Sequence, residues 1–381
     1  MRHHGYAILI LLILHGIGCD DATRPEAETP LVGAAATRGF VMARWHDEIP
    51  SAEHAGECPE GLNVTEAEYY PEQWSTWMTE RLRLRDLGEY LPWDDGRLPP
   101  DACQDPQVQP DPGFLTLDGP AVVHGLDLDG VASVRTAAPG GSCAHDDFRG
   151  PNGETGVDHQ LWRLMGCIRG YRPNDLMDRL HNSNVMIKEG GYAVLMEISG
   201  MDDPQNDDEI EVQILSANHT VTVDATGGIM SDVSYTAHED ARFHNPPAKG
   251  RIVDGILTTE PVDLHVKVKQ QTQDNVYWYR DARLHAKVEP DGRITGVLGA
   301  YQDLDNFYWT LNEHWIGENH QGRNAAFNRG FMCSGIYHAM SRVADGHPDP
   351  ETGECTSISM ALRFEAVPAF VIRPQQVAQA D

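Results

Sequence analysis

Acidic residues between positions 124 and 158 could bind a divalent cation. This segment contains an Asp-x-Asp-Gly turn, and further carboxylates follow it before the segment ends. Calcium prefers six to eight oxygen ligands, mostly carboxylates and carbonyls on loops. The sequence therefore predicts calcium as a cofactor in this segment. The candidate ligands are Asp127, Asp129, Asp146, Asp147 and Asp158.

The spacing of these acids is not that of an EF-hand. In an EF-hand loop, glycine occupies the sixth position and glutamate the twelfth. Counted from Asp127, the glycine falls at the fourth position as Gly130, and the twelfth position is Ala138. A pair of solvent-exposed Asp-Gly turns is the alternative to a cation site here.

A second acidic loop lies between two expected strands, Tyr192–Ser199 and Glu209–Leu215. Its carboxylates would repel one another without a counter-ion. Runs of like charge usually form solvated surface loops, which we expect here, with a bound cation as the alternative. The residues concerned are Asp202, Asp203, Asp207 and Asp208.

No motif assigns a catalytic activity. The sequence lacks a GxSxG elbow, a P-loop, an HExxH zinc motif and a GxGxxG turn after a strand. The aromatic stretch Tyr277–Tyr279 could form a sugar-binding platform. Strand alternation would place Tyr277 and Tyr279 on one face and Trp278 on the other, and one of these faces should be core. An extracytoplasmic, carbohydrate-active hydrolase with an acidic cleft therefore stays open as the alternative function.

The N-terminus has the features of an export signal. A short basic start at residues 2–4 precedes an apolar run, Tyr6–Leu14. That run is too short to cross a hydrocarbon core of about 30 Å, but it suits a signal-peptide core. The residues that follow, Gly18 and Cys19, resemble the lipobox of bacterial lipoproteins. The resemblance implies that Cys19 carries the lipid and becomes the first residue of the mature chain.

The number of cysteines agrees with export. Of seven cysteines, six remain once Cys19 is set aside, an even number for a compartment that permits disulfides. No two of them are spaced as CxxC, so we expect neither a zinc ribbon nor a redox pair. Six cysteines allow fifteen pairings. The pairing with the shortest loops is Cys58–Cys103, Cys143–Cys167 and Cys333–Cys355.

The chain is strongly acidic, with a formal net charge of −29. Nucleic acid is excluded as a partner, because phosphate binding needs clustered Lys and Arg. Electrostatic attraction to an anionic membrane surface is excluded for the same reason. The expected membrane contact is the lipid anchor, and the expected location is extracytoplasmic, facing the periplasm or on the cell surface.

Short strands should dominate the mature chain, because 36 glycines and 24 prolines favour turns over long helices. Alternating patterns predict strands, and Pro290-Asp291-Gly292 is a turn signal between two of them. The expected strands are Gly39–Trp45, Tyr192–Ser199, Glu209–Leu215, Thr220–Asp224, Ile252–Leu257, Val262–Val268, Tyr277–Glu289, Arg293–Ala300, residues 358–362 and Val367–Ile372. Apolar spacings of three and four predict helices at Glu66–Leu87, Gly156–Arg169, Asp175–His181, Leu304–Trp315 and Gly330–Ala344.

These elements predict a mainly β protein with flanking helices, of the α+β class. The sheet should be an antiparallel sandwich or a curled sheet, braced by disulfides. The expected organisation is a signal peptide (1–18), a tether (19–38), a helical or irregular segment (39–112), a β-rich domain with C-terminal helices (113–374) and a polar tail (375–381). The predicted function is an exported, lipid-anchored binding or structural module that calcium stabilises.

Overall fold

The structure is a computed structural model in which residues 35–381 form one compact unit. It describes residues 37–49, 60–65, 105–118, 121–133, 143–168, 179–270, 273–315, 321–323 and 331–374, and isolated residues between 58 and 83. The predicted signal peptide, Cys19, Cys103 and the polar tail lie outside the described residues. Within the described part, no helix has the length and apolar character needed to cross a membrane.

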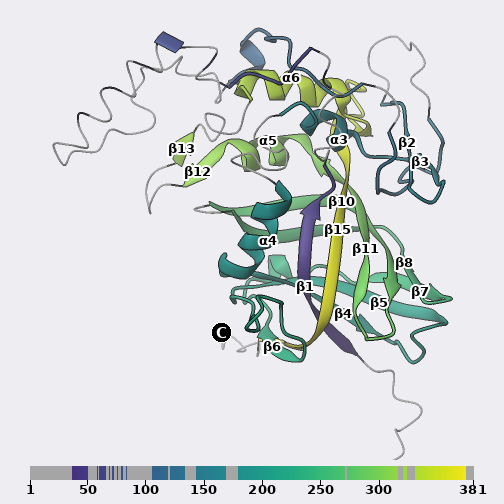
Figure 1. Ribbon diagram of the computed structural model, residues 1–381. Helices are drawn as coiled ribbons and strands as arrows, with labels where there is room; N and C mark the ends of the chain where they lie inside the picture. Colours follow the sequence, from purple (N-terminus) through teal and green to yellow (C-terminus); the bar gives the residue numbers. More distant parts are fainter. Residues whose placement is uncertain are drawn as a thin grey trace, which may run out of the picture. The chain divides into compact units, whose positions relative to one another are not determined.

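The main sheet is antiparallel along its whole circumference and closes on itself (Figure 1). The last strand, β15, pairs with the first strand, β1, as well as with its other neighbour, so the strands form one curled sheet. Closure gives each of these strands a partner on both sides over at least part of its length. Around the sheet they are β1 (Arg38–Asp47), β4 (Ala193–Ser199), β5 (Asp207–Ala217), β7 (Ala248–Val253), β8 (Ile256–Thr259), β10 (Gln273–Val288), β11 (Ile294–Asp303) and β15 (Cys355–Ile372).

The mainly β fold with flanking helices is thus confirmed, and the curled sheet is the arrangement present. The first strand of the 39–112 segment belongs to the same sheet as the β-rich domain, because β1 pairs with β4 and β15. Strand β9 (Val262–Gln270) follows β8 after Pro261 and pairs with the first half of β10.

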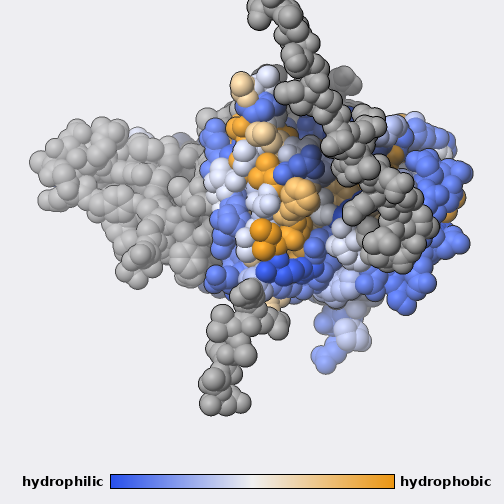
Figure 2. All heavy atoms as spheres, turned by 90° about the horizontal axis from the view of Figure 1, so that it is seen from below, coloured by the Kyte–Doolittle hydropathy of each residue, from blue (hydrophilic) through white to orange (hydrophobic). Residues whose placement is uncertain are grey.

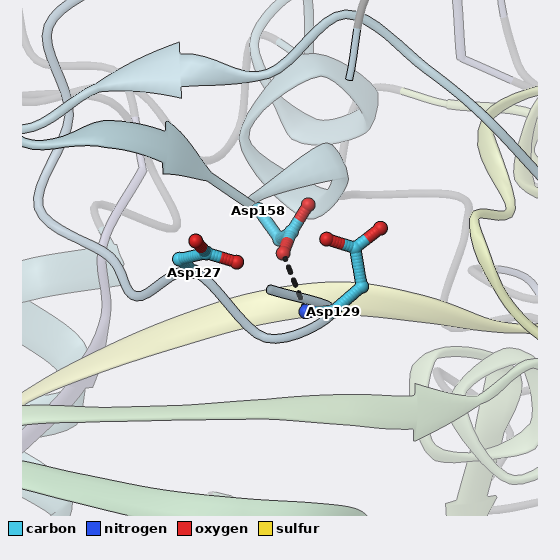
Figure 3. Close-up of side chains that lie close together, drawn as sticks. All are labelled: Asp127, Asp129 and Asp158. Carbon is cyan, nitrogen blue, oxygen red and sulfur yellow. Dashed lines mark hydrogen bonds between the residues drawn. The ribbon is translucent and has the colours of Figure 1, made fainter. Parts of the chain in front are cut away.

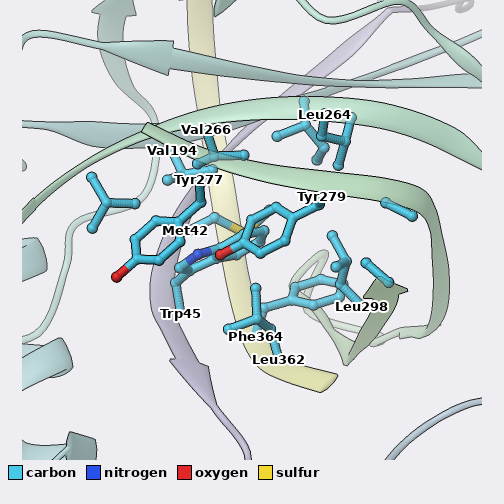
Figure 4. Packing of buried hydrophobic residues seen from close by; sticks show 14 of the residues in the cluster. Met42, Trp45, Val194, Leu264, Val266, Tyr277, Tyr279, Leu298, Leu362 and Phe364 are labelled. Atoms are coloured by element: carbon cyan, nitrogen blue, oxygen red, sulfur yellow. The ribbon is translucent and has the colours of Figure 1, made fainter. Parts of the chain in front are cut away.

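Alternation along the strands explains the core. Tyr277 and Tyr279 are buried and stacked with ring centroids 5.9 Å apart, whereas Trp278 between them is 48% exposed. Apolar side chains from six strands meet inside the curled sheet (Figure 4). The residues labelled there are Met42, Trp45, Val194, Leu264, Val266, Tyr277, Tyr279, Leu298, Leu362 and Phe364.

The outer face of β11 and β15 carries small residues. Ser359 and Ala361 on β15 are fully buried, although they alternate with residues of the inner core. On β11, a Cβ on Gly299 would lie 3.0 Å from side-chain atoms of Leu126. These small residues let the segment that contains the predicted ligands pack directly against the sheet.

The helices and remaining strands lie around this sheet. The helical elements are η2 (Pro106–Val108), α3 (Gln160–Met165), α4 (Arg179–Glu189), η4 (Ala241–Phe243), α5 (Leu304–Asn312) and α6 (Cys333–Val343). The short strands are β2 (Phe148–Arg149), β3 (Thr155–Val157), β6 (Val233–Thr236), β12 (Glu313–Trp315), β13 (Gln321–Arg323) and β14 (Gly346–Pro348). A second, small core under the β2–β3 pair comprises Leu117, Val123, Phe148, Val157, Trp162 and Cys167.

Four predicted elements are wrong in part. The helix expected at Leu304–Trp315 ends at Asn312, because Glu313–Trp315 pairs with β13 as strand β12. The expected strand Ile252–Leu257 is a hairpin, since Asp254 and Gly255 have φ angles of 50° and 76° and reverse the chain. The helix expected from Gly156 begins only at Gln160, because Thr155–Val157 pairs with β2. Thr220–Asp224 makes only an isolated bridge, from Val223 to Ile229.

Two other expected helices fall largely outside the described residues. For Glu66–Leu87, the described residues from Glu68 to Arg83 are helical and exposed. Thr65 and Glu68 exchange hydrogen bonds between side chain and backbone, which is a capping box at the helix start. Most of Asp175–His181 also lies outside, and α4 is described from Arg179.

Disulfides connect segments that are far apart in the sequence. Cys58 pairs with Cys167, and Cys143 pairs with Cys355, at sequence separations of 109 and 212. Cys333 is also disulfide-bonded. The shortest-loop pairing is therefore wrong, because the folded chain places Cys58 beside Cys167 and Cys143 beside Cys355. These bonds indicate an oxidising, extracytoplasmic environment.

Candidate metal centre

The loop between residues 126 and 131 presents two of the predicted ligands. The Gly130 backbone N–H donates to Oδ1 of Asp127 (2.7 Å), and the Val131 N–H donates to Oδ1 of Asp129 (2.8 Å). Aspartates commonly hold turns in this way. In both residues these bonds use only Oδ1, so Oδ2 is left for another partner.

Asp158 lies at the centre of this loop (Figure 3). It follows β3 and precedes α3, and it is only 5% exposed. Its Oδ2 accepts hydrogen bonds from the backbone N–H groups of Leu128 (2.7 Å) and Asp129 (3.3 Å). The Asp158 N–H in turn donates to the carbonyl of Leu126 (2.9 Å). The loop is therefore wrapped around this buried carboxylate.

Three carboxylates are close enough to share one ion. One oxygen each from Asp127, Asp129 and Asp158 can be chosen so that all three lie within 4.8 Å of one another. Two oxygens that each lie about 2.4 Å from a calcium ion are at most about 4.8 Å apart. These oxygen–oxygen distances are thus compatible with one shared ion. Distances of more than about 10 Å between the carboxylates would exclude a shared ion, and this triad has none.

Two further carboxylates belong to the same electrostatic cluster. Asp147 accepts a hydrogen bond from the Ser133 N–H, and Asp345 accepts one from the Ser359 N–H (2.7 Å). Asp147 was predicted, whereas Asp345 was missed. Asp345 directly precedes β14, and the Cys143–Cys355 disulfide joins the chain near Asp147 to the start of β15.

Burial and mutual repulsion perturb these acids. Burial, assisted by the charges of Asp345, Asp129 and Asp147, raises the pKa of Asp158 to about 8. Burial and the charge of Asp147 raise the pKa of Asp345 to about 7. The pKa of Asp147 is also raised, first by burial and then by the charges of the loop aspartates. Such a group of carboxylates is fully charged at neutral pH only if positive charge is brought to it.

Buried neutral groups surround the cluster. Burial raises the pKa of Tyr301 further above its usual range, and the charges of Asp158 and Asp345 add to this shift. His159 is fully buried, and its Nε2 donates to the carbonyl of Glu48 (2.7 Å). Burial lowers the pKa of His159 to about 4, so the ring is neutral at pH 7. This hydrogen bond holds the residue after Asp158 against the end of β1.

Gln160 provides an independent sign of a missing partner at the cluster. It is 1% exposed, its N–H donates to Ser359, and its Nε2 donates to the carbonyl of Asp146 (3.2 Å). Its Oε1 has no hydrogen-bond partner among the described residues. A buried amide oxygen without a partner is costly. Ser359, which accepts the Gln160 N–H, donates its own N–H to Asp345, so Gln160 adjoins the residues that hold Asp345.

Asp146 is placed differently from the other predicted ligands. Its side chain is exposed and lies outside the triad that can share an ion. Its backbone carbonyl accepts hydrogen bonds from Gln160 and from Arg163 Nη2 (3.1 Å). Asp146 therefore supports the segment through its backbone.

The second acidic loop forms the turn between β4 and β5. Oδ2 of Asp207 accepts from the Asp202 N–H (2.9 Å), and Oδ1 of Asp203 accepts from the Gln205 N–H (2.8 Å). In the described part of the chain, these acids do not form a metal-ligating group. Asp208 lines an open groove of about 480 Å³ beside β7 and β8. The loop thus has the geometry of a solvated turn.

Among the described residues, the groove beside β5, β7 and β8 and the exposed Trp278 lie on different strands. The groove beside β5, β7 and β8 is lined by acids, Lys249, Arg251 and threonines, and no lining residue is aromatic. The exposed Trp278 packs edge-to-face on His265 (5.5 Å) on other strands. No protein family, curated protein or solved structure matches this chain.

Proposed function

We propose that this protein is an exported, lipid-anchored structural or binding module whose fold is stabilised by a calcium ion. One observation carries the calcium assignment: carboxylates from separate chain segments converge on Asp158. Gln160, whose Oε1 has no hydrogen-bond partner among the described residues, adjoins this cluster and offers a further oxygen ligand. Calcium suits the site best because every candidate ligand is an oxygen and the ligands lie on loops.

The ion would act as a crosslink. Asp127 and Asp129 come from the loop that covers β11, Asp158 from the β3–α3 junction, and Asp345 from the chain that enters β14. Neutralising their repulsion would hold these segments against the sheet. Because the fold binds the ion and the unfolded chain does not present the site, binding would stabilise the folded state.

Export and anchoring rest on the N-terminus. The signal-like start and the lipobox-like Gly18-Cys19 support lipidation of Cys19. The disulfides support the compartment. A lipid anchor would also reconcile membrane attachment with a net charge of −29, since acyl chains bind without needing charge attraction.

The calcium assignment is tested with Asp129→Asn and the matched control Asp203→Asn. Both carboxylates are exposed and accept one backbone N–H through Oδ1, and asparagine can keep that bond. We expect calcium to raise the melting temperature of the wild type and of Asp203→Asn, and to raise that of Asp129→Asn much less. Metal analysis of the purified protein should find calcium. If neither calcium nor a chelator changes the melting temperature of the wild type, the assignment is wrong.

The anchor is tested separately with Cys19→Ala. The wild-type protein should fractionate with membranes, and the variant should be released in soluble form with the same melting temperature. A wild-type protein that is exported but soluble would contradict lipidation.

A further inference from the structure

One end of the sheet carries exposed apolar side chains. Phe370 is 59% exposed and Ile372 is 48% exposed, and both project from the same face of β15 because they lie two residues apart. Met230 and Val223, each 42% exposed, belong to the neighbouring hairpin. We call these four residues the apolar end. Figure 2, which views the molecule from below, shows apolar side chains gathered on this face.

Backbone bonds hold the apolar end together. The Asp232 N–H donates to the carbonyl of Pro368 (2.7 Å), which fixes the hairpin beside β15. Strand β6 pairs in parallel with residues 369–372, and the Ala237 N–H donates to the carbonyl of Ile372 (2.9 Å). The apolar end is therefore a built surface rather than a loose strand end, and a solvated surface offers no reason to gather large apolar groups there.

The chain from the proposed anchor enters at this same end. Gly39 pairs with Ala369, the residue before Phe370, and a Cβ on Gly39 would lie 3.0 Å from the side chain of Val371. Thr37 is eighteen residues from Cys19. A fully extended chain of that length reaches at most about 60 Å. A lipid on Cys19 would therefore tether the protein through the apolar end, which lies within reach of the bilayer.

We propose that the apolar end rests on the bilayer that holds the Cys19 lipid. The inference depends on the lipid anchor proposed above. The acidic β4–β5 loop lies at this end, because Arg38 pairs with Ile198 beside it. Its carboxylates would be repelled by anionic headgroups. The contact is therefore with the interface of neutral, zwitterionic lipid, and it is apolar and insensitive to salt.

The test uses tryptophan as a depth probe in the full-length, lipid-modified protein. Phe370→Trp places the probe at the apolar end, and Val122→Trp is the matched control. Val122 is 61% exposed and bridges to β2, which lies at the other end of the sheet in Figure 1. The proteins are reconstituted into vesicles of zwitterionic phosphatidylcholine with brominated acyl chains, and the wild-type emission is subtracted.

We expect the added fluorescence of Phe370→Trp to lose intensity in brominated vesicles, at low and high salt alike, and that of Val122→Trp to keep it. If both probes lose the same fraction of their emission in brominated vesicles while the protein is membrane-bound, the proposed contact is wrong but the anchor is not. Failure of the wild type to bind membranes would instead overturn the anchor. The contact would also be overturned if the tryptophan of Phe370→Trp is shielded from solvent in detergent and the particle mass rises with protein concentration. That result would show that a second copy of the chain covers this surface.

Discussion

Asp158 and Asp345 interact electrostatically although most strands of the sheet lie between them in the sequence. The charge of Asp345 contributes to raising the pKa of Asp158 to about 8. Asp158 ends the β2–β3 unit, whereas Asp345 follows α6. Their proximity depends on the outer face of β15, where Ser359 contacts both Asp345 and the residue Gln160. The candidate site is thus a product of the closed sheet.

The variant Asp345→Asn tests two effects of this carboxylate: its repulsion of the neighbouring aspartates and its contribution to calcium binding. Asparagine can still accept the Ser359 N–H, so the packing should survive. Removing one negative charge should stabilise the calcium-free protein, by about 1 kcal/mol if it relieves one unit of pKa shift. The gain in melting temperature on adding calcium should shrink if Asp345 is a ligand. An unchanged calcium gain would show that Asp345 contributes neither a ligand oxygen nor its charge to calcium binding.

Calcium should stabilise the protein more at pH 8 than at pH 5. The folded, calcium-free protein holds a proton on Asp158 more tightly than the unfolded chain, because the pKa rises from 3.8 to about 8. The calcium-free protein therefore loses stability as the pH rises through this range. Calcium competes with that proton, so binding should release protons. Denaturant unfolding at both pH values, with calcium or with chelator, measures the difference.

A larger calcium gain at pH 5 would have the wrong sign and would contradict ligation by Asp158. Asp203→Asn serves as the control in both conditions, because its carboxylate lies in the solvated turn.

The strands with clear alternation could be predicted from the sequence. The expected strand Val262–Val268 lies within β9 (Val262–Gln270), with Leu264 and Val266 buried as the pattern indicates. The Asp254-Gly255 hairpin was missed although Asp-Gly is a strong turn signal. Apolar residues on both sides of it, from Ile252 to Leu257, look like one continuous strand. The positive φ angles of Asp254 and Gly255 reverse the chain, so the apolar run is divided between two paired strands.

The site could be predicted only where it is local. Asp127 and Asp129 lie in one short turn, and the bridge between Leu126 and Asp158 brings Asp158 to that turn. No local pattern distinguishes Asp345 from other Asp-Gly turns, and Asp146 has the same residue type as its neighbour Asp147 but an exposed side chain. The cysteine pairing was wrong for the same reason: loop length favours near partners, whereas the closed sheet places Cys143 beside Cys355.

The two disulfides should differ in their effect on calcium binding. Replacing Cys143 and Cys355 together by serine should lower the free energy of unfolding by about 2–5 kcal/mol. It should also weaken calcium binding, because Asp147 and Asp345 lie close to the bonded residues in sequence. The matched control replaces Cys58 and Cys167, whose bond braces the small second core. Calcium titration followed by calorimetry compares the two at a temperature where both are folded.

Equal calcium affinities of the two double variants would contradict the idea that the Cys143–Cys355 bond positions the site.

Gly299 should be sensitive even to alanine. Its added Cβ would lie 3.0 Å from atoms of Leu126, which is tighter than ordinary van der Waals contact, and overpacking of this kind costs about 1–3 kcal/mol. Leu126 precedes Asp127, and its carbonyl accepts the Asp158 N–H, so the displaced loop should also bind calcium less tightly. Adding Leu126→Ala to Gly299→Ala frees the space and should recover part of the calcium affinity, since the loop returns to the sheet. If Gly299→Ala lowers stability but leaves calcium affinity unchanged, the outer face of β11 supports the fold without positioning the ligands.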